Sequence, residues 1–213
     1  MSTVPMMGFK PSVNPKVTAE DENIAIAFGM GLTAEKVADK YNISREDQDA
    51  FALESHKRAL KANEEGLFAD EIAPITTTES VYSLETKEYS VKTTVVSQDE
   101  GPREGSNIEA LGKLRTVFAQ EGSVTAATSS QMSDGAAAVL IASEAAVKKY
   151  KLTPKAEFVA YAVAGVPAEI MGIGPVKAIP KALEKAGLSI EDIGWIELNE
   201  AFAAQALAVI NEL

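Results

Sequence analysis

The sequence predicts an α/β fold in which a mixed α+β region precedes layered βαβ packing. After residue 133, helix-forming segments alternate with three apolar segments of strand length, 136–142, 156–163 and 193–198. Because these segments are largely apolar on both faces, we expect internal strands of a sheet that helices cover. Residues 1–132 instead combine helices with a strand pair and more loop. With 213 residues, 46% of them hydrophobic, the chain can bury a sizeable core.

Composition and charge argue against several classes of protein. The formal net charge is −11, so long-range electrostatics oppose binding to nucleic acid or to an anionic membrane. No apolar run approaches the roughly 20 residues of a membrane span, and the N-terminal residues lack the pattern of a secretory signal. We therefore expect a cytoplasmic protein with neither nucleic-acid nor membrane partners. Without cysteine there are no disulfides or thiolate metal sites, and we expect no metal.

Capping residues predict where the first two helices begin and end. Prolines and glycines make residues 1–32 irregular, with an apolar stretch from Ile24 to Phe28. Thr33 is a plausible N-cap for a short helix through Tyr41. Ser44, with Asp47 three residues on, predicts a capping box and a longer helix to about Glu65, closed by Gly66. The stripe that we expect this longer helix to bury consists of Ala50, Phe51, Leu53 and Leu60.

The next segments are expected to be strands and loops. Residues 72–96, rich in Thr, Val, Ile and Tyr, predict a β-hairpin or strand pair. Residues 98–105 form a turn-rich loop, and 108–118 a short helix or turn. Residues 122–130 are almost wholly small.

Capping residues also predict helix ends in the region after residue 133, where helices and apolar segments alternate. Ser143 can cap a helix to about Tyr150, and Gly187 can close one that begins at Gly174 or Pro175. Residues 201–213 are strong helix formers, so Asn199 lies on a strand-to-helix turn. There it can cap the helix, or point outward and hold a water or a carbonyl.

His56 is the only histidine. Ser-His-Asp chemistry would have to use it, but it lies in a polar helix, which favours a solvated surface role.

Six stretches resemble motifs of the thiolase family, in the order in which the family has them. The resemblance is nearest to the degradative 3-ketoacyl-CoA thiolases, with the acetoacetyl-CoA thiolases next. Each stretch alone is a weak signal, but together they extend over almost the whole chain. They are Ser44–Ala52, Asp70–Pro74, Asp99–Arg103, Ser129–Ala138, Met171–Pro175 and the Asn-Glu-Ala-Phe-Ala sequence at 199–203.

The resemblance implies an incomplete thiolase-like fold. Thiolases have two similar α/β halves, with a loop region inserted into the first half. Residues 1–132 resemble that CoA-covering loop region, and residues 133–153 the last strand and helix of the N-terminal half. Residues 154–213 resemble the first part of the C-terminal half. The resemblance also implies a homodimer or homotetramer for the full-length parent.

Physical chemistry and the resemblance together suggest a site for coenzyme A (CoA), as substrate and not as a covalently bound cofactor. CoA phosphates need cations, and Arg103, Lys113 and Arg115 flank a Gly-rich loop. The family match selects Arg103 for the nucleotide end. The thin pantetheine arm needs a slot walled by small residues, which 125–130 would supply. By resemblance, Ala126 and Ser130 contact this arm, Phe118 lies by the adenine or upper pantetheine, and Met30 and Met171 lie near the acyl end.

By resemblance, Asn199 positions a water that, with a histidine, forms an oxyanion hole for the thioester carbonyl. Ala201 and Phe202 would line the same pocket. On spacing alone, core packing explains Phe118, Met30 and Met171 better than ligand contact does. A surface turn explains Arg103 as well as phosphate binding does.

The sequence also departs from the family. A thiolase needs a nucleophilic cysteine, a Gly-His-Pro histidine and a second cysteine, and none is present. We therefore expect a middle segment of an acyltransferase that is inactive alone. Its parent would cleave 3-ketoacyl-CoA with CoA to acetyl-CoA and a shortened acyl-CoA in fatty acid β-oxidation, or catalyse the reverse reaction, acetoacetyl-CoA formation. Alternatives are a non-catalytic CoA-binding or interaction module and a ketoacyl synthase.

A second departure is Ala127-Thr128, where the family usually has Gly-Asn. If that glycine has a positive φ, alanine is strained there.

Overall fold

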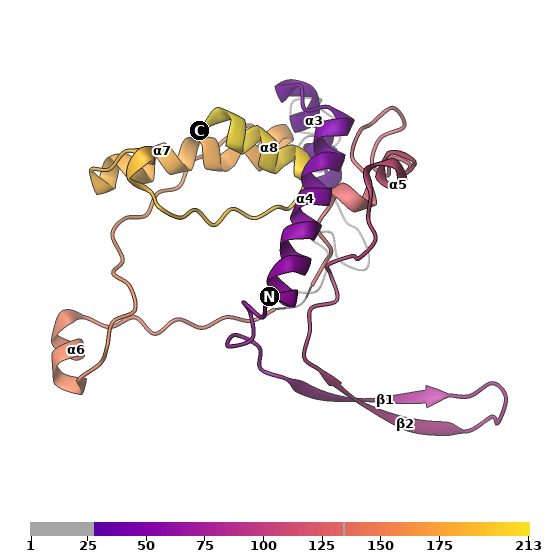
Figure 1. Ribbon diagram of the computed structural model, residues 1–213. Coiled ribbons are helices and arrows are strands. Elements are labelled where there is room, and N and C mark those ends of the chain that lie inside the picture. The colour runs from indigo at the N-terminus through magenta and orange to yellow at the C-terminus, as the bar shows by residue number, and fades with distance from the viewer. Residues whose placement is uncertain (1–27, 134) are drawn as a thin grey trace, which may run out of the picture.

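The computed structural model describes residues 28–133 and 135–213. Figure 1 shows a helical body from which a β-hairpin projects, while helix α6 stands apart at the end of two extended segments. Of the irregular segment expected over residues 1–32, residues 1–27, with most of the apolar stretch that begins at Ile24, lie outside the described residues, and residues 30–32 are helical instead.

Helix α3 spans Met30–Tyr41 and begins earlier than the sequence predicts. Gly29 is its N-cap, and Thr33 lies inside the first turn, where its hydroxyl donates to the Met30 carbonyl at 2.7 Å. The predicted N-cap at Thr33 is therefore wrong, because its hydroxyl bonds a helix carbonyl and not a free N–H. The predicted end at Tyr41 is confirmed.

Helix α4 spans Arg45–Glu64 and confirms the predicted capping box. The Asp47 N–H donates to the Ser44 hydroxyl at 3.0 Å, and Gly66, with φ of 69°, follows the helix. The predicted apolar stripe is wrong, however. Ala50 is exposed and Phe51, Leu53 and Leu60 are only half-buried, whereas Gln48, Asp49 and Ala52 are buried.

Polar contacts explain which face α4 buries. The Arg45 guanidinium pairs with Asp49 at 2.8 Å and donates to the Leu111 carbonyl, at the end of α5 (Ile108–Gly112), at 2.7 Å. Gln48 Nε2 donates to the Ser123 hydroxyl at 2.9 Å. Helix α4 thus packs on a loop through hydrogen bonds, which a search for apolar periodicity cannot detect.

Strands β1 (Ile75–Tyr82) and β2 (Tyr89–Val96) confirm the predicted hairpin. They pair antiparallel, from Ile75 opposite Val96 to Tyr82 opposite Tyr89, and every residue in them is exposed. The Tyr82 and Tyr89 rings lie 5.0 Å apart near the turn.

The hydrophobic core lies where α3, the 3₁₀ segment η3 (Ala168–Ile173), α7 (Gly174–Ala186) and α8 (Ala203–Glu212) meet. Gly187, with φ of 68°, closes α7 as predicted. The α8 helix begins two residues later than expected, with Phe202 at its N-cap. The core residues are Val37, Ala38, Ile43, Ile170, Ile173, Val176, Ala204, Ala208 and Val209.

Three short helices complete the described elements. Helix α6 (Glu144–Tyr150) has the predicted Ser143 cap, whose hydroxyl accepts from the Ala146 N–H. The 3₁₀ segment η2 covers Ala126–Thr128, and η4 covers Ile190–Asp192. At η4, the backbone N–H and hydroxyl of Ser189 donate to Asp192 and lower the pKa of that carboxyl.

The three strands predicted over 136–142, 156–163 and 193–198 are wrong for this structure. All three segments are extended but unpaired, and the only sheet among the described residues is the β1–β2 hairpin. Figure 1 shows the reason, because the chain on either side of α6 runs without a neighbouring strand. A strand needs a partner for its backbone hydrogen bonds, whatever its side-chain pattern.

A partly buried carboxylate contact connects α3 to the loop before η2. The Glu35 carboxylate accepts from the Ser123 N–H at 2.8 Å and from the Val124 N–H at 3.0 Å. Gly122 permits this approach, because a Cβ there would lie 2.1 Å from Glu35 Oε1.

Glu35→Ala should lower the free energy of unfolding by about 1–3 kcal/mol, because two partly buried N–H groups lose their acceptor. Urea denaturation measures this. The control Glu54→Ala, which removes an exposed 2.8 Å pair with Arg58, should cost less than about 0.5 kcal/mol. Equal losses in the two variants would contradict a structural role for Glu35.

Candidate functional site

Two hollows meet at the turn over residues 199–202. The larger, a groove of about 1160 Å³, runs between α4, the segment after η2 and this turn. The smaller, a cavity of about 380 Å³, lies between α3, η3 and the same turn. Both are mainly apolar, and they share part of their walls. The shared residues are Met30, Leu198, Asn199, Ala201 and Phe202.

Hydrogen bonds from two other segments hold the turn. The Ser130 N–H donates to the Ala201 carbonyl at 3.0 Å, and Ser129 bridges to Phe202 in an antiparallel arrangement. From α4, the Ser55 hydroxyl donates to the Glu200 carboxylate at 2.7 Å. Segments 71 to 145 residues apart in sequence therefore form one groove.

An aromatic pair forms part of the groove wall. The rings of Phe118 and Phe202 meet edge to face, with centroids 5.9 Å apart. Gly31 in α3 lies directly against the Phe118 ring, since a Cβ at Gly31 would be 2.1 Å from it.

The structure brings together most of the residues predicted for CoA binding. Met171 lines the smaller cavity, and Arg103 and Ala126 line neither hollow. Ala126 begins η2, whose other two residues do line the groove. The predicted residues in the groove wall are Met30, Phe118, Ser130, Asn199, Ala201 and Phe202.

Two alternatives for local conformation are settled. Asn199 is not the cap of α8, because Phe202 holds that position and Asn199 is exposed to both hollows. Ala127 is absent from the described residues with positive φ, so its departure from glycine carries no backbone strain.

His56 lines the groove, which its polar neighbours in the sequence do not predict. It is half-buried in the groove wall, and its Nδ1 accepts the Arg103 N–H at 3.2 Å, so in the neutral imidazole the proton is on Nε2. The expectation of a solvated surface role is therefore corrected. One signal was available, because Ala52, Ser55 and His56 share one face of α4 and all line the groove.

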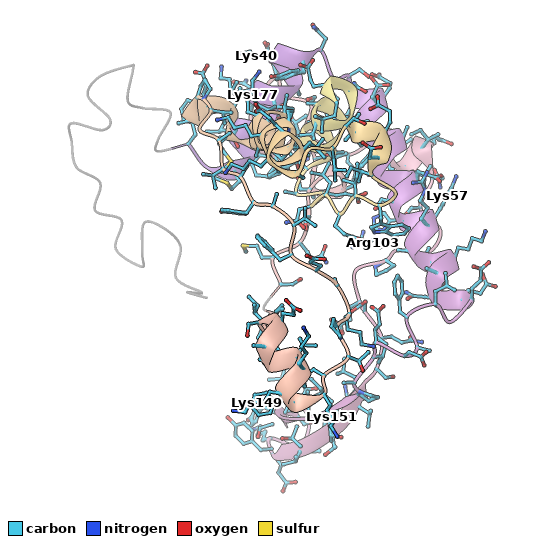
Figure 2. All side chains as sticks on the ribbon, turned by 90° about the vertical axis from the view of Figure 1, so that its left-hand side faces the viewer. Lys40, Lys57, Arg103, Lys149, Lys151 and Lys177 are labelled. Atoms are coloured by element: carbon cyan, nitrogen blue, oxygen red, sulfur yellow. The ribbon has the colours of Figure 1, made fainter. Side chains whose placement is uncertain are left out.

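Arg103 lies just outside the groove. Figure 2 shows it on the side of α4 that faces the helical body, whereas Lys57 projects from the other side. Within residues 28–133 and 135–213, no carboxylate pairs with its guanidinium, whereas Lys113 is paired with Glu109 at 2.6 Å. Arg103 can therefore bind an anion at the end of the groove.

The wall of the smaller cavity contains a buried polar atom that has no hydrogen-bond partner among the described residues. Gln205 is 7% exposed, and its Oε1 has no hydrogen-bond partner among the described residues. This cavity thus combines apolar walls with an acceptor that has no partner among the described residues, while the groove has the Arg103 backbone next to it, bonded to His56 in the groove wall. In the described part of the chain, no group of acidic or histidine side chains could hold a metal ion, and no helix could cross a membrane.

Comparison with known proteins gives the family. The model of the thiolase N-terminal domain matches residues 11–145, and that of the thiolase C-terminal domain matches residues 152–213. The chain therefore belongs to the thiolase family, and its fold is a partial thiolase fold.

Individual relatives agree with this. The chain is 49% identical over 213 residues to a 3-ketoacyl-CoA thiolase of Bacillus subtilis (strain 168), of which it covers 54%. It resembles the crystal structure of the dimeric peroxisomal thiolase of Saccharomyces cerevisiae with TM-score 0.82 and 39% identity, over 99% of this chain and 50% of that one. For the acetyl-CoA acetyltransferase of Bacillus anthracis the TM-score is 0.77 at 48% identity, over 86% and 44%. The chain thus spans about half the length of these relatives.

Packing of Phe118 on Gly31 predicts that Gly31→Ala destabilises the wild-type chain but stabilises a chain that lacks the Phe118 ring. In the wild-type chain, Gly31→Ala pushes the Phe118 ring off Phe202, which should cost about 0.5–1.5 kcal/mol of edge-to-face contact. In a Phe118→Ala background, the same substitution should stabilise by up to about 1 kcal/mol, because alanine favours the helix. Urea denaturation of the four chains measures both effects. An equal effect of Gly31→Ala in both backgrounds would rule out this contact.

Proposed function

We propose that this chain forms the CoA-cradling part of a 3-ketoacyl-CoA thiolase, with the substrate thioester lying along the groove. The observation that carries the proposal is the convergence of six predicted site residues, Asn199 and five predicted substrate contacts, on one groove. Next to it, Arg103 has no carboxylate partner among the described residues and can bind phosphate. Names of relatives at 46–52% identity support the substrate class.

In this proposal the ligand has a fixed direction. The CoA phosphates lie near Arg103, with the Nε2 side of His56 as a further donor at this end. The pantetheine arm passes the small residues around Ser130, and the thioester carbonyl lies by Asn199. The acyl chain enters the smaller cavity beside Met171. A carboxamide at Asn199 can hold a water as a donor toward the oxygen that becomes negative during attack.

The proposed reaction of the parent enzyme is thiolysis. 3-Ketoacyl-CoA and CoA give acetyl-CoA and a shortened acyl-CoA, by transfer of the acyl group through an enzyme thioester. We propose a role in fatty acid β-oxidation, in the cytoplasm, for a homodimer or homotetramer. The dimeric yeast relative supports an oligomer.

Calorimetric titration with CoA tests the nucleotide end of the site. Arg103→Ala should weaken binding about 10- to 100-fold, because a charged hydrogen bond to phosphate contributes about 1.5–3 kcal/mol. Lys57→Ala is a matched control that changes the net charge equally on the opposite side of α4, and it should alter affinity only slightly. Equal losses in both variants would mean non-specific attraction and contradict a phosphate site at Arg103.

A thiolysis assay tests whether this chain can catalyse the reaction without the rest of a thiolase. The chain alone should not convert acetoacetyl-CoA and CoA, because it has no thiol to accept the acyl group. The full-length Bacillus subtilis relative is the positive control. Turnover by residues 1–213 alone would overturn the proposed inactivity. If CoA binds but no thiolase assembly containing this chain is ever active, the alternative of a non-catalytic CoA-binding module is favoured.

A further inference from the structure

We infer that His56 is a positioning residue for phosphate recognition, because it holds the loop over residues 98–105, called here the Arg103 loop, against α4. The inference rests on the proposed function, in which Arg103 binds a phosphate of CoA. The observation that carries it is a hydrogen bond between elements 47 residues apart in sequence, from the Arg103 N–H to His56 Nδ1 at 3.2 Å. His56 thus affects the ligand through Arg103.

The hydrogen bond acts on the residue that carries the charge. Its donor is the backbone N–H of Arg103 itself, so the bond fixes the start of this side chain relative to α4. An arginine side chain already has several rotatable bonds, and a moving backbone would add to the freedom that is lost when a phosphate binds. Anchoring the backbone reduces this loss and so raises the affinity.

A second contact places the Arg103 loop beside the groove. Gly101 lies against the side chain of Gln131, since a Cβ at Gly101 would be 3.1 Å from Gln131 Nε2. Gln131 and His56 both line the groove. The Arg103 loop therefore contacts the groove wall at two elements, α4 and the segment after η2.

The residue before His56 holds another part of the groove wall. The Ser55 hydroxyl donates to the Glu200 carboxylate at 2.7 Å. Consecutive residues of α4 thus bond to the turn over residues 199–202 and to the Arg103 loop. Because a helix holds side chains more precisely than a loop does, α4 sets the separation between these two segments.

Replacement of the imidazole can remove its acceptor with little change of shape. Nδ1 accepts the Arg103 N–H, and the carboxamide oxygen of asparagine lies the same number of bonds from Cβ as Nδ1 does. Leucine has methyl groups at the corresponding positions. His56→Asn and His56→Leu therefore differ in hydrogen bonding but little in shape. Both variants lack Nε2, so any direct contact from that nitrogen is removed equally from both.

Calorimetric titration of the full chain with CoA, at about pH 8 so that an imidazole is neutral, tests the inference. His56→Leu should bind CoA about 3- to 10-fold more weakly than His56→Asn, the factor that one neutral hydrogen bond contributes. Asn63→Leu is the matched control, because it makes the same exchange of asparagine for leucine at an exposed position of α4. Its affinity should equal that of the wild-type chain. Equal affinities of the two His56 variants, or an equal loss in Asn63→Leu, would overturn the inference.

Removal of the Arg103 side chain tests whether His56 acts through it. In an Arg103→Ala background, His56→Leu and His56→Asn should bind CoA with the same affinity, since there is no guanidinium left to position. Loss of the difference between the two variants would support the positioning role. A difference that persists would mean that position 56 contacts the ligand directly, and would overturn this role.

Amide resonances of the ligand-free chain separate this inference from the proposed function. The Arg103 amide proton should resonate at higher frequency in the wild-type chain and in His56→Asn than in His56→Leu, because only the first two offer an acceptor. The same resonance position in both His56 variants would overturn the inference. This difference without any CoA binding would support the positioning of the loop and contradict the proposed function. CoA binding of equal strength by both His56 variants would have the opposite meaning.

Discussion

Close packing of α3 on α8 is the constraint on which the rest of the helical body depends. Small side chains permit it, since Ala204 and Ala208 on α8 are completely buried against a seam that contains Val37 of α3. Because alanine adds little bulk, the two helix backbones can approach each other closely. This approach brings Met30 to the turn over residues 199–202 and so creates the common wall of both hollows. A larger residue at either alanine would separate the two parts of the chain that form the site.

Local signals in the sequence predict local structure well in this chain. The Ser44 capping box, the Ser143 cap and the stop at Gly187 were all predicted, because each depends on residues within one turn of helix. The hairpin was predicted for the same reason, since its strands are neighbours in sequence. The buried face of α4 was not. It is fixed by contacts from Arg45 and Gln48 to residues 66 to 75 positions away, and a polar face carries no periodic apolar signal.

The same distinction explains how much of the site could be predicted. Resemblance of motifs identified six of the residues that line the groove, although spacing alone favours core packing for Phe118 and Met30. His56 was assigned to the surface because its neighbours in sequence are polar. Its actual partner is the backbone of Arg103, 47 residues away, in a loop whose path no local pattern specifies. The prediction of three strands was wrong for a related reason. An apolar pattern predicts that a segment is buried, but it does not identify the partner that buries it.

The two ends of the groove therefore differ in how completely this chain determines them. At the small-residue end, the Ser130–Ala201 hydrogen bond and the Phe118–Phe202 contact define the walls without any other polypeptide. At the reacting end, Asn199 follows a segment with almost no backbone partners. Stabilisation of a developing oxyanion requires donors held within a few tenths of an ångström, and an unpaired segment cannot provide that precision. In the proposed function, binding of the carrier and positioning of its carbonyl thus depend on different parts of the described structure, the groove walls and the segment before Asn199.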